Sequence, residues 1–96
     1  MRKYEVTFIV RPDLEEANIT KVAEDMKKVL TDNGAKVLEE KPMGQKELAY
    51  EIQKFKTGYD FYYVIDANNS DAINEFNRIS RISEDVIRHL IVKVED

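Results

Sequence analysis

Two runs in which every second residue is apolar, each followed by a segment of longer period, most constrain what this chain can fold into. The first run, Tyr4–Val10, predicts a half-buried strand that Pro12 ends. From Leu14 onward apolar residues recur at steps of three and four, which predicts an amphipathic helix ending at Asn33–Gly34, a pair suited to a left-handed C-cap. The second run, Tyr59–Asp66, predicts another strand, and its aromatic density suits a central position in a sheet.

The segment between the first helix and the second run also has strand character. Residues 35–55 alternate in two stretches, with Pro42 and Gly44 between them. Because Gly and Pro inside a strand pattern mark bulges and edges, we predict one long or bulged strand here. Lys56–Gly58 is predicted to be the turn that follows it.

The last third of the chain repeats the change of period. The cluster Asn68–Ser70 is typical of a helix N-cap, and the helical spacing that follows ends at Ser83–Asp85. Residues 86–94 then predict a fourth strand.

The element order is therefore β-α-β-β-α-β, without a linker or a low-complexity segment, so we expect a single domain over residues 1–96. Two right-handed β-α-β crossovers that share one sheet interleave into a four-stranded antiparallel sheet of order 2-3-1-4. This is the ferredoxin-like split βαβ arrangement of the α+β class, with both helices on one face. The other face of the sheet is predicted to be bare.

Composition excludes several kinds of site. The chain has no cysteine and one histidine, which argues against disulfides, thiolate metal sites and most catalytic triads. The three glycines stand far apart, so there is no Gly-rich phosphate loop. We expect no enzymatic activity, no metal and no cofactor. The start of the chain lacks the apolar region of a signal peptide and no apolar run is long enough to span a bilayer, so we expect a cytoplasmic protein.

Strand parity predicts which side chains the bare face presents. In the last strand we expect Val86, Leu90, Val92 and Val94 to face the core, and we also place Tyr50 in packing near the sheet core. An apolar patch with a charged rim is then predicted on the bare face, as expected of a surface for a protein partner; its members would be Ile9, Tyr62, Val64, Ile87 and Ile91. Only Tyr62 among the aromatic residues of the third strand points outward, so this sheet offers little surface for stacking RNA bases.

The net charge of −4, from 15 basic and 19 acidic residues, argues weakly against a nucleic-acid ligand. Its distribution qualifies this conclusion, because the acidic residues concentrate on the two helices while many basic ones belong to strands and strand ends. Attraction to phosphate acts within about 8–10 Å, so a local basic edge can bind nucleic acid despite the total.

A longer segment of the sequence carries a resemblance to a known family. The run Gly44-Gln45-Lys46-Glu47-Leu48-Ala49-Tyr50-Glu51-Ile52-Gln53-Lys54 resembles a characteristic segment of the bacterial small-subunit ribosomal protein family numbered six, the S-six family. Further matches in the same order are Arg2–Glu5, Arg11–Asp13, Gly58–Tyr59 and Val86–Arg88, so the resemblance covers essentially the whole chain. Gln45 and Glu51 depart from the family's usual Arg and Pro.

The resemblance implies a non-enzymatic constituent of the small ribosomal subunit. It implies binding to the central domain of the small-subunit ribosomal RNA, and pairing with small-subunit ribosomal protein eighteen as a heterodimer. The side chains that we expect to contact RNA are strand-end cations: Arg2, Lys3, Lys46, Lys54, Lys56, Arg88 and Lys93. The main alternative is a regulatory domain of the same βαββαβ type that binds a small molecule. An acylphosphatase-like enzyme is a weaker alternative, because Pro12 and Asp13 do not suit a phosphate-cradling loop.

Overall fold

The computed structural model describes residues 2–94, and its elements follow the predicted order. The four strands are β1 (Arg2–Val10), β2 (Lys36–Ile52), β3 (Phe55–Ala67) and β4 (Val86–Val94), and the helices are α1 (Glu16–Asp32) and α2 (Asp71–Ile82). No helix within residues 2–94 is long and apolar enough to cross a membrane.

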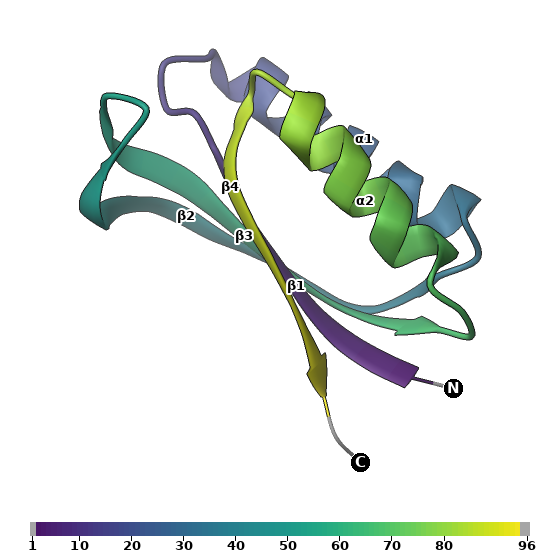
Figure 1. Ribbon diagram of the computed structural model, residues 1–96. Helices are drawn as coiled ribbons and strands as arrows, with labels where there is room; N and C mark the ends of the chain where they lie inside the picture. The colour runs from purple at the N-terminus through teal and green to yellow at the C-terminus, as the bar shows by residue number, and fades with distance from the viewer. Residues whose placement is uncertain (1, 95–96) are drawn as a thin grey trace.

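The strands form one sheet of order β2-β3-β1-β4, in which each neighbouring pair is antiparallel. Both helices lie on the same side of it (Figure 1), so the predicted fold is confirmed. The opposite side of the sheet carries no helix, and we call it the open face. The sheet therefore presents one face to the core and leaves the other available to ligands or partners.

Aromatic rings fill the space between the sheet and the helices. The ring centroid of Phe8 lies 5.3 Å from that of Phe61 and 5.8 Å from that of Phe76 on α2. The fully buried Tyr63 meets Phe8 edge to face and donates a hydrogen bond from its hydroxyl to the carbonyl oxygen of Ala23 at 3.3 Å. Burial raises the pKa of the Tyr63 hydroxyl, so it remains a neutral hydrogen-bond donor.

The predicted long or bulged strand is confirmed as β2, which pairs with β3 through three register shifts. The predicted turn at Lys56–Gly58 is wrong, because β3 already begins at Phe55. The chain turns at Gln53 and Lys54, both with positive φ, of 49° and 71°. Gly58 lies inside β3, where a Cβ would overlap Cγ2 of Ile9. Glycine is thus needed at residue 58 for a close approach of two strands and not for a turn.

A bulge at the start of β4 reverses the predicted parity of that strand. Val10 pairs with Val86, whereas Ile9 pairs with Arg88, so Ile87 is the extra residue. From Arg88 onward each side chain points to the face opposite to the one predicted.

The consequences run along the rest of β4. Leu90 and Val92 were expected in the core but are 56 % and 46 % exposed, opposite Thr7 and Glu5 of the open face. Ile91 was expected on the open face, but it pairs with Val6 and packs against the core.

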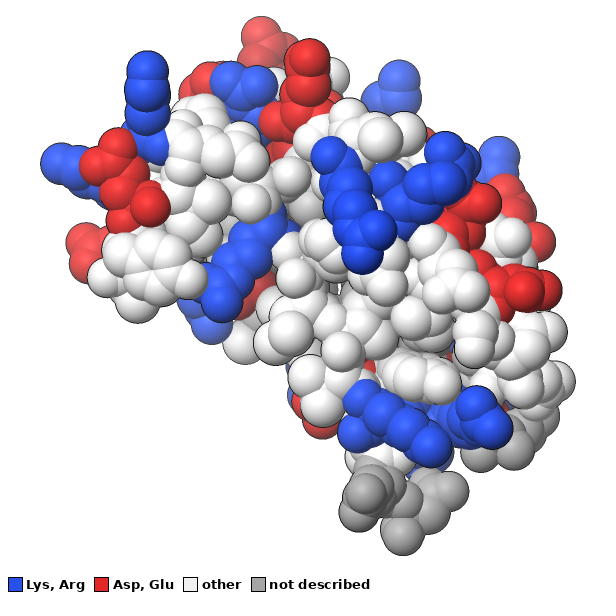
Figure 2. All heavy atoms as spheres, in the orientation of Figure 1, with Lys and Arg blue, Asp and Glu red and all other residues white. Residues whose placement is uncertain are grey.

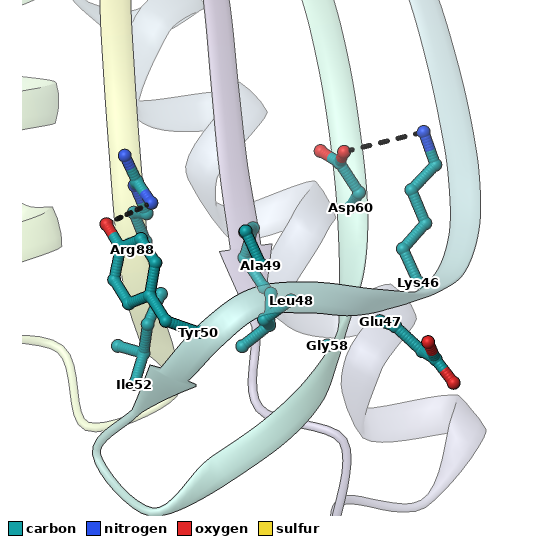
Figure 3. A pocket seen from close by; sticks show the side chains of 10 residues that line it. Lys46, Glu47, Leu48, Ala49, Tyr50, Ile52, Gly58, Asp60 and Arg88 are labelled. Atoms are coloured by element: carbon teal, nitrogen blue, oxygen red, sulfur yellow. Dashed lines mark hydrogen bonds and ion pairs between the residues drawn. The ribbon is translucent and has the colours of Figure 1, made fainter.

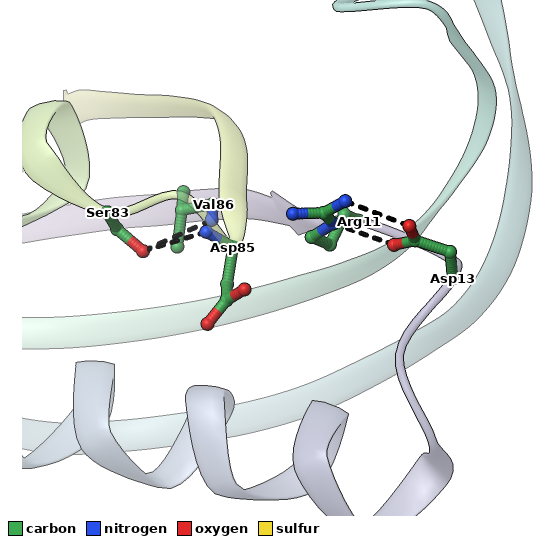
Figure 4. Close-up of polar contacts among 5 residues, drawn as sticks. All are labelled: Arg11, Asp13, Ser83, Asp85 and Val86. Atoms are coloured by element: carbon green, nitrogen blue, oxygen red, sulfur yellow. Dashed lines mark hydrogen bonds and ion pairs between the residues drawn. The ribbon is translucent and has the colours of Figure 1, made fainter.

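Arg11 holds the start of β4 against the end of β1. Its guanidinium makes two hydrogen bonds to the carboxylate of Asp13, at 2.7 and 2.8 Å, and its backbone N–H donates to the carbonyl of Asp85 at 2.9 Å (Figure 4). The Ser83 hydroxyl accepts hydrogen bonds from the backbone N–H groups of Asp85 and Val86. The guanidinium of Arg11 also lies 5.2 Å from the ring centroid of Phe55, so the backbone and side chain of this one residue together connect three segments at this end of the sheet.

Candidate functional site

The open face divides into an apolar half and a polar half. Four exposed or half-buried apolar side chains from β3, β1 and β4 form what we call the apolar stripe: Val64, Ile9, Leu90 and Val92. The β2 side of the face instead carries charged residues, among them Lys36, Glu39 and Lys41 in register with β3. An apolar stripe with charged residues beside it is the composition expected of a surface that binds another protein.

The structure brings together three of the five residues predicted for the partner interface. Ile9, Tyr62 and Val64 lie on the open face. Ile91 is half-buried and packs against the core from the helix side, and Ile87 is only 7 % exposed, so the prediction that these two belong to the exposed surface of the open face is wrong. The pKa of the Tyr62 hydroxyl is raised by desolvation and by the nearby carboxylate of Glu5, which keeps it neutral beside the stripe.

Sequence reasoning missed Leu90 and Val92. Both are apolar and alternate as core residues do, and the single extra residue of the bulge that turns them outward leaves no clear mark in the sequence. The one available signal is the pair of adjacent apolar residues Val86 and Ile87, both of which are buried.

All seven predicted RNA-contacting cations are exposed, and they form two groups. Arg2, Lys3 and Lys93 form the terminal group, where Lys3 pairs with Val94 and Tyr4 with Lys93. Lys46, Lys54, Lys56 and Arg88 form the hairpin group, around the β2–β3 connection and the neighbouring start of β4. Figure 2 shows Lys and Arg side chains gathered at both of these ends, with Asp and Glu interleaved among them at the hairpin end.

The far end of β2 curls across the open face towards β4 (Figure 3). Tyr50 accepts a hydrogen bond from Nη1 of Arg88 at 2.8 Å, and the guanidinium carbon lies 5.6 Å from the Tyr50 ring centroid. Tyr50 is 61 % exposed, so the prediction that it packs near the sheet core is wrong. β2 and β4 are opposite edges of the sheet, and this contact joins them above it.

A hollow of about 190 Å³ lies between the curled hairpin and the sheet. Ile9, Gly58 and Asp60 form part of its lining from the sheet, and Leu48 and Tyr50 line it from the hairpin (Figure 3).

Asp60 in this hollow is a half-buried carboxylate. Its Oδ2 lies 3.8 Å from Nζ of Lys46, and its buried Oδ1 has no hydrogen-bond partner among the described residues. Desolvation raises the pKa of Asp60, against the opposing effect of Lys46. The Lys46 ammonium is thus held at the edge of the open face by a carboxylate from the neighbouring strand.

The described residues offer no group of three or more His, Cys, Asp or Glu side chains that could hold a metal ion. His89, the one histidine, lies on the helix side of β4, where its Nε2 is 3.1 Å from Oδ1 of Asn77. The geometry is suited to binding. Apolar surface lies at the centre of the open face, cations lie at both ends, and an exposed tyrosine lies at one of these ends.

Comparison with known proteins shows the family. The model of the family described as Ribosomal protein S6 matches residues 3–93. The "Small ribosomal subunit protein bS6" of Lactiplantibacillus plantarum is 44 % identical over 95 residues, which is 99 % of this chain and 96 % of that protein. The crystal structure of 30S ribosomal protein S6 from Thermotoga maritima superposes with a TM-score of 0.92 at 26 % identity, covering 97 % of this chain and 87 % of that one. The chain belongs to the ribosomal protein S6 family.

Proposed function

We propose that this chain binds the central domain of the small-subunit ribosomal RNA together with small-subunit ribosomal protein eighteen, as a non-enzymatic component of the cytoplasmic ribosome. The observation that carries the proposal is the open face, on which the apolar stripe has Lys3 at one end and Arg88 with Lys46 at the other. Arg2 and Lys93, in register with Ala67 and Tyr4, extend the terminal group on the helix side of the sheet. Family membership supports the same ribosomal setting.

The apolar stripe is the surface that we assign to the partner protein. Glu5 lies between Val64 and Val92, and Leu90 pairs with Thr7, two residues along β1 from Ile9, on a sheet face that no helix covers. Burying such side chains against a partner releases about 25 cal/mol for each Å² of apolar surface removed from water. A basic partner would also offset the net charge of −4, which opposes approach to RNA.

The two cation groups are the surface that we assign to RNA. Along β1, Lys3 pairs with Val94 and Ile9 pairs with Arg88, so six residues separate the two ends. At about 3.3 Å per residue the groups lie roughly 20 Å apart, a distance that spans several phosphates of a nucleic-acid strand. Contacts of this kind fix the position of RNA and carry little sequence information, so specificity comes from RNA shape and from the partner.

Binding to an RNA fragment of the central domain, measured with and without ribosomal protein eighteen across a salt series, tests the proposal. We expect weak binding by the chain alone, tighter binding with the partner, and a steep fall as salt rises. Removing two positive charges at once, by Lys3→Gln with Lys93→Gln or by Lys46→Gln with Lys56→Gln, is expected to reduce the slope of log affinity against log salt concentration by about two.

Lys28→Gln on the exposed side of α1 is the matched control and is expected to leave the slope unchanged. Strong, salt-insensitive binding by the isolated chain would contradict the proposal, and so would equal slopes for all the variants.

A further inference from the structure

A second and larger hollow lies against the curled hairpin. It has a volume of about 610 Å³, and Tyr50 lines both it and the smaller hollow against the sheet. Its lining consists of Glu47, Leu48, Tyr50, Glu51, Lys56 and Thr57. A volume of this order admits one nucleobase with its ribose, and no described side chain fills it.

Tyr50 is held in place although it is exposed. The hydrogen bond from Arg88 fixes its hydroxyl, and the Arg88 guanidinium lies over its ring. An aromatic ring that is already ordered loses little conformational freedom when a planar ligand stacks on it. Tyr50 is therefore a preorganised stacking surface at the wall of the larger hollow.

The charges around this hollow select the kind of ligand. Glu47 and Glu51 line it beside a single cation, Lys56, so a bare phosphate inside would meet more negative than positive charge. Lys46, Lys54 and Arg88 surround the same hairpin, so a cationic protein side chain would have to approach through like charges. A ligand with neutral hydrogen-bond donors at one end and a phosphate at the other fits both conditions, and a nucleotide has this form.

A carboxylate distinguishes among the four bases. Guanine presents two adjacent donors on its Watson–Crick edge, N1–H and the 2-amino group, which match the two oxygens of one carboxylate. Adenine and cytosine have an acceptor next to their amino group, and uracil has an acceptor on each side of its N3–H, so none of the three offers two adjacent donors. Stacking on tyrosine adds affinity for any base, and the carboxylate of Glu51, the neighbour of Tyr50 in the lining, adds the preference.

We infer that the larger hollow binds one unpaired guanine of RNA, stacked on Tyr50, with Glu51 accepting from its Watson–Crick edge and Lys56 beside its phosphate. This inference rests on the proposed RNA-binding function and adds to it a sequence preference at a single position. The open face of the sheet takes no part in the stacking, because the ring belongs to the hairpin above it.

Titration of the full ¹⁵N-labelled chain with the single-stranded RNAs UUGUU, UUAUU, UUUUU and UUIUU, where I is inosine, tests the inference. We expect saturable NMR shifts of the amides of Tyr50, Glu51 and Thr57 with UUGUU, and about tenfold weaker binding of UUAUU and UUUUU. Inosine lacks the 2-amino group and is expected to bind between these limits. Tyr50→Leu should weaken UUGUU binding about tenfold, whereas Tyr50→Phe, which keeps the ring, should stay within threefold of the unchanged chain.

The carboxylate is tested with Glu51→Gln, which should abolish the difference between UUGUU and UUAUU. Glu47→Gln is the matched control and should preserve the difference, because Glu47 lies at the other end of the curled segment from Tyr50 (Figure 3). Equal affinity for all four RNAs would overturn the inference, as would shifts confined to residues outside the hollow. Tighter binding of a Gly-Arg-Gly peptide than of UUGUU at the same amides would also overturn it, and would assign the hollow to a protein side chain. The same variants are also assayed for binding to the central-domain RNA together with ribosomal protein eighteen. If the unchanged chain binds that RNA but shows no preference for UUGUU, the inference alone is contradicted. If the unchanged chain does not bind the central-domain RNA, the proposed function is contradicted.

Discussion

Gly58 occupies the point of β3 where a side chain has no room. A Cβ at this residue would overlap Cγ2 of Ile9 and lie 3.4 Å from the carbonyl oxygen of Val10. Because backbone and a stiff β-branched side chain are the obstacles, Gly58→Ala is expected to lower the free energy of unfolding by roughly 1–3 kcal/mol. Urea unfolding followed by circular dichroism measures this loss.

The double-mutant cycle with Ile9→Ala isolates that overlap. Ile9→Ala removes Cγ2, so adding Gly58→Ala to this variant is expected to cost much less than it does in the unchanged chain. Strictly additive losses would mean that Gly58 is required for another reason, such as its backbone conformation.

His89 connects protonation to stability. Its ring lies between α2 and β4, 6.2 Å from the ring centroid of Phe76, and desolvation together with the charge of Arg81 lowers its pKa from the ordinary 6.5. The folded chain therefore binds a proton at this residue less readily than the unfolded chain does. The neutral ring contributes its full stability above about pH 6.5, and this contribution is lost as the pH falls through 6.5 towards the lower, folded-state pKa.

Urea midpoints at pH 7.5 and pH 5.5, measured for the unchanged chain and for His89→Gln, test this dependence. His89 is the one histidine, so the substitution removes the imidazole titration and leaves the carboxylates. We expect the unchanged chain to lose more stability than His89→Gln between the two pH values. An equal loss in both would place the titration elsewhere.

Among the elements, the β2–β3 hairpin turns at an unfavourable pair of residues. Gln53 and Lys54 both have positive φ, a region that costs an ordinary L-residue about 1–2 kcal/mol. Two-residue hairpin turns of this kind favour Asn-Gly. Gln53→Asn combined with Lys54→Gly is therefore expected to raise the free energy of unfolding by about 1 kcal/mol, measured by urea unfolding.

Lys56→Gly, two residues further along and inside β3, is the matched control. A glycine there gains no turn conformation and loses strand propensity, so this variant is expected to be less stable than the unchanged chain. If the turn substitutions also destabilised the chain, the positive φ values would not be the limiting feature of this hairpin.

The elements also show what the sequence could and could not predict. The order of strands and helices followed from period alone, because alternation over Tyr4–Val10 and helical spacing after Leu14 are local properties. The facing of β4 could not be predicted in this way, since one bulged residue, Ile87, reverses every side chain after it. The turn was placed at Gly58 because glycine usually marks turns, whereas here it serves a close approach between strands that lie far apart in sequence.

For the site, exposure of the cations was predictable from their charge, but their division into two groups was not. The backbones of Lys3 and Lys93 lie close together only because β1 pairs with β4, with the two side chains on opposite faces of the sheet. Arg88 meets Tyr50 only because the end of β2 crosses the sheet. Such juxtapositions depend on tertiary structure, and composition or spacing does not encode them. The same limit explains why the sequence wrongly predicted that Tyr50 packs near the core.

For the molecule as a whole, apolar surface is more localised than charge. The apolar stripe lies on the open face, whereas both signs of charge occur on the helices and on the open face, where Lys3 and Arg88 lie near Glu5 and Asp60. The acidic surplus that we expected on the helices is therefore small, and the net charge of −4 is spread over the molecule. A basic partner on the open face would offset this charge and favour the approach of that side to RNA.

Leu90 and Val92 are the two most exposed residues of the apolar stripe. Replacing Leu90 and Val92 by threonine keeps strand propensity but removes apolar surface from the stripe, so we expect affinity for ribosomal protein eighteen to fall about tenfold or more in titration calorimetry. Ile82→Thr is the matched control, because Ile82 is 66 % exposed but ends α2 on the opposite side of the sheet. Both variants should unfold within about 1 kcal/mol of the unchanged chain, since exposed side chains contribute little to the core. Unchanged affinity in the Leu90 and Val92 variant, or an equal loss in the Ile82 variant, would place the partner on another surface.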